Sequence, residues 1–168
     1  MEEIRNKVAE SGLITLDMAD YFPKESILSF DIKEYLWQGF ALKEKDFRDH
    51  LKDHDWSQYQ DKYVSVFCSE DAIIQSWAYM LIGTYLEGIA KDIHFGPADK
   101  FEQELLVQNL SNMDLSEFTD ERIIVKGCGD KHISNAAYLK ISHILKPVVK
   151  SLMFGEACSS VPVYKKAR

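Results

Sequence analysis

Three cysteines are the residues of this chain whose type and position are best suited to chemistry. Cys68 and Cys128 each follow an apolar stretch that predicts a β-strand, and each stands a few residues before an expected helix. In open α/β sheets, ligands bind beyond the carboxyl ends of the strands, next to helix N-termini. The positive end of a helix stabilises a thiolate there, which favours metal binding or nucleophilic attack.

The third cysteine, Cys158, follows the last expected strand and extends this pattern to a possible metal site. Duplicated segments that pack strand end to strand end would bring the three thiols together. Structural zinc takes four ligands, and His132, four residues after Cys128, is the candidate for the fourth. The leading hypothesis is therefore a zinc site formed by Cys68, Cys128, Cys158 and His132. An iron–sulfur cluster with three thiolates and one other ligand is the less favoured cofactor.

Two other interpretations of the cysteines stay open. The chain has no Cys-x-x-Cys pair, the feature that makes a zinc signature specific. Free cysteine is often buried and then behaves as a small apolar residue. The first alternative is thus a binding or scaffold module whose cysteines have no chemical role. The second is a thiol-dependent enzyme or redox sensor with Cys128 as its nucleophile.

Two further patterns are weaker. Glycines flank Cys128 within residues 126–131, so backbone amides ahead of the next helix could bind an anion. This segment lacks the length of a P-loop, and a tight strand-to-helix turn is the favoured interpretation. Asp46, His50 and His54 recur every four residues, a spacing at which two histidines can share a metal. Their charged neighbours favour a solvated helix face instead.

The elements that must position these residues occur twice in the chain. Residues 51–96 align with residues 110–155 at an offset of 59, with 14 identities in 46 pairs. Chance at ordinary composition gives roughly three. Cys68 and Cys128 occupy nearly the same place in the two copies, 60 residues apart. Two copies predict a duplicated unit and not a solenoid, which needs more repeats.

The spacing of apolar residues predicts an alternation of helices and strands. Helices are expected over residues 2–10, 43–52, 71–88, 101–110 and 134–145. Strands are expected over residues 13–18, 27–32, 63–67, 93–95, 123–125 and 149–154. Residues 156–164 are expected to be irregular, with an edge strand as the alternative.

This alternation predicts an α/β or α+β fold with helices packed on a mixed sheet. At 168 residues the chain is expected to be a single domain with an internally duplicated helix–strand–helix–strand unit. Its expected parts are an N-terminal helix with strands (1–39), a first unit (40–96), a second unit (97–155) and a C-terminal extension (156–168).

The composition is that of a soluble, acidic globular protein, with 46% hydrophobic residues and a net charge of −7. The negative charge argues against nucleic acid or an anionic membrane as the main partner. No apolar run approaches the ~18 residues of a membrane span. No signal-peptide core follows the acidic N-terminus, so the cytoplasm is the expected location. The sequence indicates no substrate, protein partner or oligomeric state.

Three segments of the sequence are distinctive. They are Asp-Trp-Ser-Gln-Tyr-Gln-Asp-Lys-Tyr-Val at 55–64, Val-Lys-Gly-Cys at 125–128 and Phe-Gly-Glu-Ala-Cys-Ser-Ser-Val-Pro-Val-Tyr-Lys at 154–165. With them the chain resembles, over nearly its whole length, an uncharacterised bacterial protein family (domain of unknown function 2480). The resemblance implies a single-domain, cytoplasmic protein and includes the positions of the three cysteines. It assigns them no role.

Overall fold

The computed structural model describes residues 12–127 and 129–167. The expected helix over residues 2–10 and the predicted ligand Cys128 lie outside the described residues. The contacts within the chain define two compact units. The contiguous unit is Lys24–Glu102, and the split unit runs up to Pro23 and resumes at Gln103.

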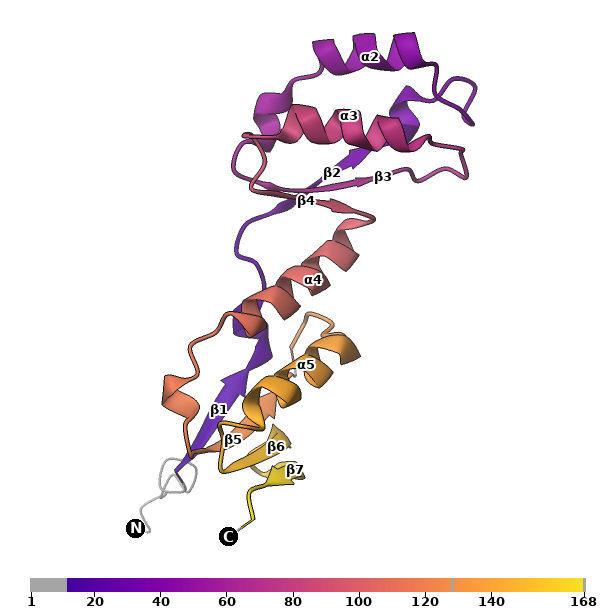
Figure 1. The fold of residues 1–168 in the computed structure, drawn as a ribbon. Helices are drawn as coiled ribbons and strands as arrows, with labels where there is room; N and C mark the ends of the chain where they lie inside the picture. The colour runs from indigo at the N-terminus through magenta and orange to yellow at the C-terminus, as the bar shows by residue number, and fades with distance from the viewer. Residues whose placement is uncertain (1–11, 128, 168) are drawn as a thin grey trace, which may run out of the picture. The chain divides into compact units, whose positions relative to one another are not determined.

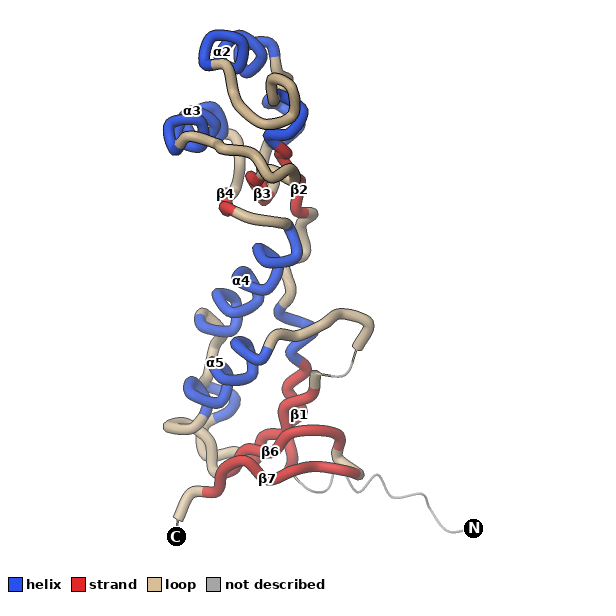
Figure 2. Tube along the Cα trace, turned by 90° about the vertical axis from the view of Figure 1, so that its right-hand side faces the viewer, coloured by secondary structure: helices blue, strands red, loops and turns tan. Residues whose placement is uncertain are grey.

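The contiguous unit contains a parallel sheet with helices on one face (Figure 1). Its described strands lie in the order β2-β3-β4, and both pairings are parallel. The strands are β2 (Ile27–Asp31), β3 (Tyr63–Phe67) and β4 (Asp92–Phe95). The helices are α2 (Glu44–Asp53) and α3 (Ser76–Leu86), with short 3-10 helices η2 (Ile32–Tyr35) and η3 (Trp56–Tyr59). Figure 2 shows α2 and α3 on the same side of the three strands.

Apolar residues at helical spacing place both helices of the contiguous unit on the sheet. Phe47 and Leu51 are the buried residues of the otherwise charged helix α2. Helix α3 buries Ala78, Ile82 and Leu86, which recur every four residues along one face. These side chains pack in one cluster with apolar residues of β2 and β3. Helix α3 begins five residues later than predicted.

The split unit contains the mixed sheet that the sequence predicts. Its order is β1-β5-β6-β7, with parallel pairings up to β6 and an antiparallel pairing between β6 and β7. The strands are β1 (Leu13–Asp17), β5 (Arg122–Lys126), β6 (Ser151–Glu156) and β7 (Ser159–Lys165). The helices are α4 (Ala98–Ser111), in which the unit boundary falls, and α5 (Asn135–Leu145), with 3-10 helices η1 (Met18–Tyr21) and η4 (Ser116–Phe118).

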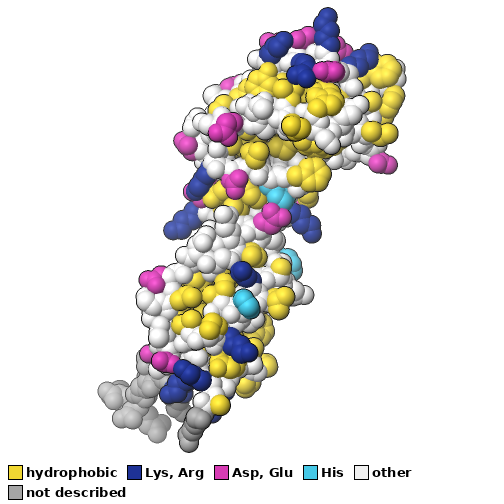
Figure 3. Space-filling model, in the orientation of Figure 1, with side chains coloured by type: hydrophobic (Ala, Val, Ile, Leu, Met, Phe, Trp, Pro, Cys, Tyr) yellow, Lys and Arg dark blue, Asp and Glu magenta, His cyan; other side chains and the backbone are white. Residues whose placement is uncertain are grey.

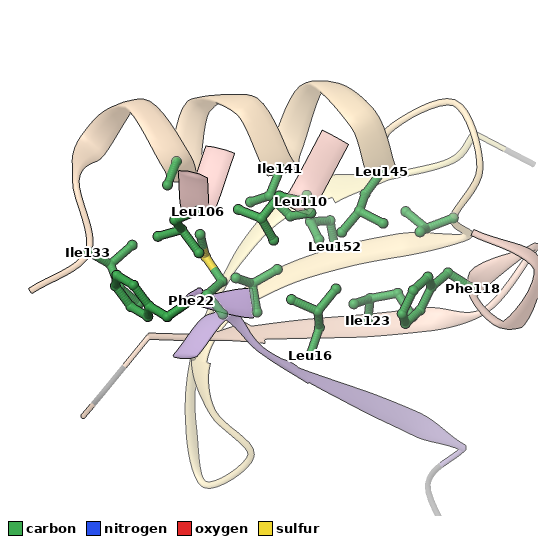
Figure 4. Packing of buried hydrophobic residues seen from close by; sticks show 14 residues of the cluster. Leu16, Phe22, Leu106, Leu110, Phe118, Ile123, Ile133, Ile141, Leu145 and Leu152 are labelled. Carbon is green, nitrogen blue, oxygen red and sulfur yellow. The ribbon is translucent and has the colours of Figure 1, made fainter. Parts of the chain in front are cut away.

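The core of the split unit lies between its helices and its sheet. Figure 4 shows Ile141 and Leu145 of α5 directed at Leu152 of β6 and Ile123 of β5. Leu106 and Leu110 of α4 belong to the same buried cluster. Strand β5 is buried along most of its length, as expected for a central parallel strand.

Elements recur along the chain at the 59-residue offset seen in the sequence. Strand β5 starts 59 residues after β3, α5 starts 59 after α3, and β6 starts 59 after β4. Two backbone features recur with them. Asp61 and Asp120 both have φ of +56°, and Gly96 and Gly155 both have strongly positive φ. The predicted α/β fold is confirmed, with two sheets among the described residues.

The first two strands also resemble each other, and they are shared between the units. Strand β1 pairs with β5 in the split unit, whereas β2 pairs with β3 in the contiguous unit. Each ends in an aspartate, Asp17 or Asp31, whose carboxylate accepts a hydrogen bond from the amide two residues on, at 2.9 and 3.0 Å. The sequence analysis did not detect this relation.

The C-terminal segment is more regular than its sequence predicts. Residues 159–165 form strand β7 along the edge of β6, so the irregular structure expected for 156–164 is wrong and the alternative edge strand is present. Pro162 is compatible with this strand because β7 lies at the edge of the sheet, where a missing amide donor is tolerated. After β4, at the equivalent point, the chain instead enters α4.

Candidate functional site

The structure places the described cysteines in different settings. Cys68 follows β3 in the contiguous unit, half-buried against the apolar core, and is a free thiol. Cys158 lies in the turn between β6 and β7 of the split unit, exposed and free. His132 precedes α5 and is exposed, and its backbone carbonyl accepts a hydrogen bond from Gln103 Nε2 at 2.8 Å.

Within residues 12–127 and 129–167, no three His, Cys, Asp or Glu side chains form a group that could hold a metal. The predicted ligand set therefore has no support among the residues described, and one of its three cysteines, Cys128, lies outside them. Metal binding stays a prediction.

The second candidate metal set, Asp46, His50 and His54, is not assembled either. His54 lies beyond the end of α2, where Nδ1 hydrogen-bonds with the Tyr35 hydroxyl at 3.1 Å and Nε2 with the Tyr59 hydroxyl at 3.3 Å. Burial lowers the pKa of His54, partly offset by Asp55. Burial, and then Tyr35, raises the pKa of Tyr59 to about 12. This cluster is a packed aromatic array and holds its imidazole neutral.

One candidate site is an apolar groove between α3 and β4, which we call the β4 groove. It has a volume of about 440 Å³, within the range of natural ligand pockets. Its lining comes from both neighbouring strands and from one side of the helix. The lining residues are Val66, Ser76, Tyr79, Gly83, Ile93, His94 and Phe95.

Strand register explains which side chains enter the groove. Ile93 pairs with Val64 and Phe95 with Val66, and both valines belong to the core beneath the helices. Partners in parallel strands point to the same face, so Ile93 and Phe95 are directed to the helix side. His94 alternates to the other face, where its ring stacks on Phe101 at 4.9 Å. Gly83 leaves room over Ile93, because an added Cβ would lie 3.8 Å from its terminal methyl.

The split unit has a groove at the same place, which we call the β6 groove. Its volume is about 340 Å³. Seven of its lining residues occupy the positions of the β4-groove residues after the 59-residue shift. These are Val125, Asn135, Tyr138, Ser142, Leu152, Met153 and Phe154. The tyrosines match in geometry, because Tyr79 packs edge-on against Phe95 at 5.2 Å and Tyr138 against Phe154 at 5.5 Å.

The two grooves differ in what covers their outer strand. Strand β7 pairs along β6 and adds Val163 to the lining of the β6 groove. Strand β4 is the edge of its sheet in the described part of the chain. Ile93 is therefore 45% exposed, whereas its equivalent Leu152 is 2% exposed. Phe95 is 72% exposed and its equivalent Phe154 is 41% exposed.

The apolar surface of the contiguous unit continues beyond the groove. Met80, on the outward side of α3, is exposed, as is Ile73 in the segment before the helix. Figure 3 shows hydrophobic side chains spread over the face of the unit that carries α3 and β4. Scattered exposed apolar residues such as these are ordinary, whereas Ile93 and Phe95 are exposed at the groove itself.

The backbone amides at the end of β4 show which of its groups face the open edge. The Gly96 amide donates to the Val66 carbonyl at 3.0 Å, so it faces β3. Amides alternate along a strand, which directs those of Phe95 and Ile93 to the open side. The Asp92 carboxylate accepts the Ile93 amide at 2.9 Å. The edge is thus capped at its start by a charged side chain, and its apolar end is exposed.

The two units also differ at the residue that follows β3 or β5. Cys68 takes the position of Gly127 at the 59-residue offset, and a Cβ at Gly127 would fall 1.8 Å from the Tyr138 hydroxyl. Tyr138 therefore reaches over a bare backbone, where its hydroxyl lies 3.5 Å from the Gly127 carbonyl. In the contiguous unit burial raises the pKa of Tyr79, and the Cys68 thiol adds to the effect. Cys68 is packed against the apolar core and lies near Tyr79.

Comparison with known proteins gives one match. Residues 2–166 match the family described as protein of unknown function (DUF2480). The chain belongs to this family. No curated protein and no solved structure matches the chain. The family assignment confirms the resemblance seen in three sequence segments, and it brings no assigned activity with it.

The described helices are also informative about membranes. None of those within residues 12–127 and 129–167 is long and apolar enough to cross a bilayer.

Sequence reasoning missed the β4 groove. The sequence shows apolar residues at 93 and 95, as at the buried equivalents 152 and 154. It also shows Gly-Pro and a helical pattern after residue 95, where the second copy continues with β-forming residues. Together these signals indicate an apolar strand that lacks the neighbour its counterpart has.

Proposed function

We propose that this protein is a binding module and that the β4 groove takes apolar side chains of a partner protein. The observation that carries the proposal is the exposure of Ile93 and Phe95 at the mouth of a groove of about 440 Å³. Burying such residues in a partner contact is favourable by about 25 cal/mol for each Å² removed from water.

The chemistry of the lining supports a protein segment as the occupant. The walls are aliphatic and aromatic, and the polar side chains directed to them are those of Ser76 and Tyr79, since the His94 ring lies on the other face of the sheet. A lining of this kind recognises apolar and aromatic side chains and orients them through a few hydrogen bonds. The groove is also bordered by a strand edge, which offers backbone groups to a peptide.

The β4 groove can be tested with small aromatic probes on the full chain. Indole and benzyl alcohol are titrated into protein labelled at isoleucine and methionine methyl groups, and chemical shifts are followed. Ile93 and Met80 should shift in a saturable way. Gly83→Leu fills the groove and should abolish those shifts. Ser142→Leu, the same change at the equivalent position of the split unit, is the matched control and should leave them intact.

Failure would be clear in this design. Aromatic probes that leave the Ile93 methyl unmoved, or move it equally in the Gly83→Leu variant, would count against a binding function for the β4 groove. Thermal unfolding of both variants shows whether each still folds.

The cysteine hypotheses remain separate from this proposal. The half-buried position of Cys68 agrees with the alternative in which cysteines have no chemical role. Zinc or an iron–sulfur cluster held through Cys68, Cys128, Cys158 and His132 is tested by metal analysis of protein purified without a histidine tag. One equivalent of metal that is lost in Cys128→Ser would favour it.

A further inference from the structure

The β6–β7 pair shows what covers this kind of strand edge in the same chain. Strand β7 runs antiparallel to β6 and pairs with it from Ser151 to Glu156. Strand β4 has the same position relative to α3 and β3 as β6 has relative to α5 and β5. Its outer edge has no paired strand among the residues described.

We propose that β4 accepts an extended segment of a partner protein as an added antiparallel strand. The segment's alternate apolar side chains fill the β4 groove, and its basic residue lies opposite Asp92. This inference rests on the proposed function, and it adds the conformation, direction and charge of the partner. Strand addition of this kind draws affinity from main-chain hydrogen bonds and specificity from side-chain pockets.

The pairing of β6 with β7 fixes the expected register. Shifting by 59 residues transfers each β6 residue to its β4 equivalent. The transferred pairs are Asp92 with the position of Lys165, Ile93 with Tyr164, His94 with Pro162, Phe95 with Val161 and Gly96 with Ser160. A partner strand, which runs back along β4, thus needs large apolar residues followed by a basic residue.

Charge complementarity supports the basic residue. In the split unit, Lys165 lies opposite Ser151, which carries no charge. In the contiguous unit the equivalent residue is Asp92, which is exposed at the edge. A lysine or arginine of the partner opposite Asp92 would attract its carboxylate. The Ile93 amide, which now donates a hydrogen bond to that carboxylate, would then be released. The partner would then take over that amide.

Asp92 also explains how a bare apolar edge is kept from indiscriminate pairing. Exposed strand edges pair with other strands unless charged residues or short length prevent it. Strand β4 has four residues and begins with a charge. A partner segment without a basic residue would place its backbone against the unpaired Asp92 carboxylate, which is unfavourable. Selectivity for a cationic strand follows.

The probe for the experiment is the sequence of β7 itself. A fluorescein-labelled peptide with the sequence of residues 159–166, Ser-Ser-Val-Pro-Val-Tyr-Lys-Lys, is titrated into the full chain and followed by anisotropy and amide chemical shifts. We expect saturable binding, with the largest shifts at Ile93 and Phe95. Phe95→Ala should weaken binding by about tenfold. Ile73→Ala, at an exposed apolar residue outside the groove lining, should leave it unchanged.

Charge reversal gives an internal check. A peptide with Lys165→Glu should bind at least tenfold more weakly to the natural chain, about 1.4 kcal/mol. It should recover affinity for the Asp92→Lys variant. Because all these residues are exposed, the variants should unfold at the natural temperature. A lack of recovery would overturn the register.

N-methylation separates strand addition from simple groove binding. Peptides methylated at one amide each should alternate between weakened and normal affinity, because alternate amides face β4. Binding that Phe95→Ala weakens but that shows no alternation overturns strand addition and leaves the binding module intact. If the aromatic probes bind but the peptide does not, strand addition is likewise overturned and the binding module stays intact. Shifts confined to β6 and β7 would show exchange with the natural β7 and would also overturn the proposal. If neither peptide nor aromatic probes bind, the proposed function itself fails.

Discussion

The contiguous and split units build one arrangement twice and finish it differently. Both place an apolar helix over parallel strands, and both form a groove where the helix meets the outer strand. In the split unit β7 closes that strand, and Leu152 is buried. In the contiguous unit the chain turns into α4, and Ile93 and Phe95 stay exposed. The comparison shows that the same strand position is covered in one unit and open in the other, among the residues described.

The largest expected effect concerns the equivalent residues Leu152 and Ile93. Leu152→Ala removes a fully buried side chain and should lower the free energy of unfolding by about 2–5 kcal/mol. Ile93→Ala should cost less than about 1 kcal/mol, because that side chain is half in water. Urea denaturation of both variants measures the difference. Equal losses would mean that β4 is covered and would end the comparison.

A second test compares substitutions at Gly127 and Cys68, which occupy equivalent positions in the two units. Gly127→Ala places a methyl group against the Tyr138 ring and should cost about 1–3 kcal/mol. Cys68→Ala, at the equivalent position, should cost less, because the contiguous unit already accommodates a side chain there. Thermal unfolding gives the order. Adding Tyr138→Leu to Gly127→Ala should remove most of the loss, and no rescue would contradict the predicted clash.

The third prediction is a pH dependence that belongs to the contiguous unit. The folded state lowers the pKa of His54 below its ordinary value of 6.5, so the folded state binds fewer protons. The contribution is fully present above about pH 6.5 and is lost as the pH falls through that value towards the folded pKa. At the equivalent position the split unit has Met113. Urea midpoints from pH 7.5 to 5 should fall less steeply in His54→Met, and an unchanged slope would exclude His54 as the source.

The smallest effect should be the same in both units. Asp55 and Asp114 lie just before η3 and η4, and the carboxylate of each accepts a hydrogen bond from the amide two residues on, at 3.0 and 2.9 Å. The Ser57 side chain and then its amide lower the pKa of Asp55, and the Ser116 amide and then its side chain lower the pKa of Asp114. Asp55→Ala and Asp114→Ala should therefore cause equal, small losses of thermal stability. A clear difference between them would show that the equivalence does not extend to these turns.

The sequence predicts the helices and strands because their signals are local. Phe47 and Leu51 stand alone among charges, and Ala78, Ile82 and Leu86 mark one helix face, so periodicity suffices. Gly96 follows β4 and Gly155 lies near the end of β6, and glycine readily adopts the positive φ that both positions have. The resemblance of β1 to β2 is as local as these signals and could have been found.

The candidate site was not predictable in the same way, because it depends on a neighbour that is missing. Ile93 and Leu152 are both aliphatic residues in short strands, and β7 pairs along the strand of Leu152 but not along that of Ile93. The cysteines were candidates because of their chemistry, but a metal site also requires the side chains to converge, which no single residue encodes. Cys158 lies in a hairpin turn, and Cys68 follows β3 against the core of the contiguous unit.

The order of strands along the chain has a consequence for biosynthesis. A ribosome delivers β2, β3 and β4 in succession, so the nascent chain can complete that sheet early with short loop closures. Strand β1 is synthesised before β2, but its partner β5, which begins at Arg122, is synthesised only later. Until β5 is synthesised, β1 would be a competitor of β2 for pairing with β3, because the two strands resemble each other. Slow elongation before residue 102 would lengthen the exposure to this misassembly, and rapid capture of β3 by β2 would prevent it.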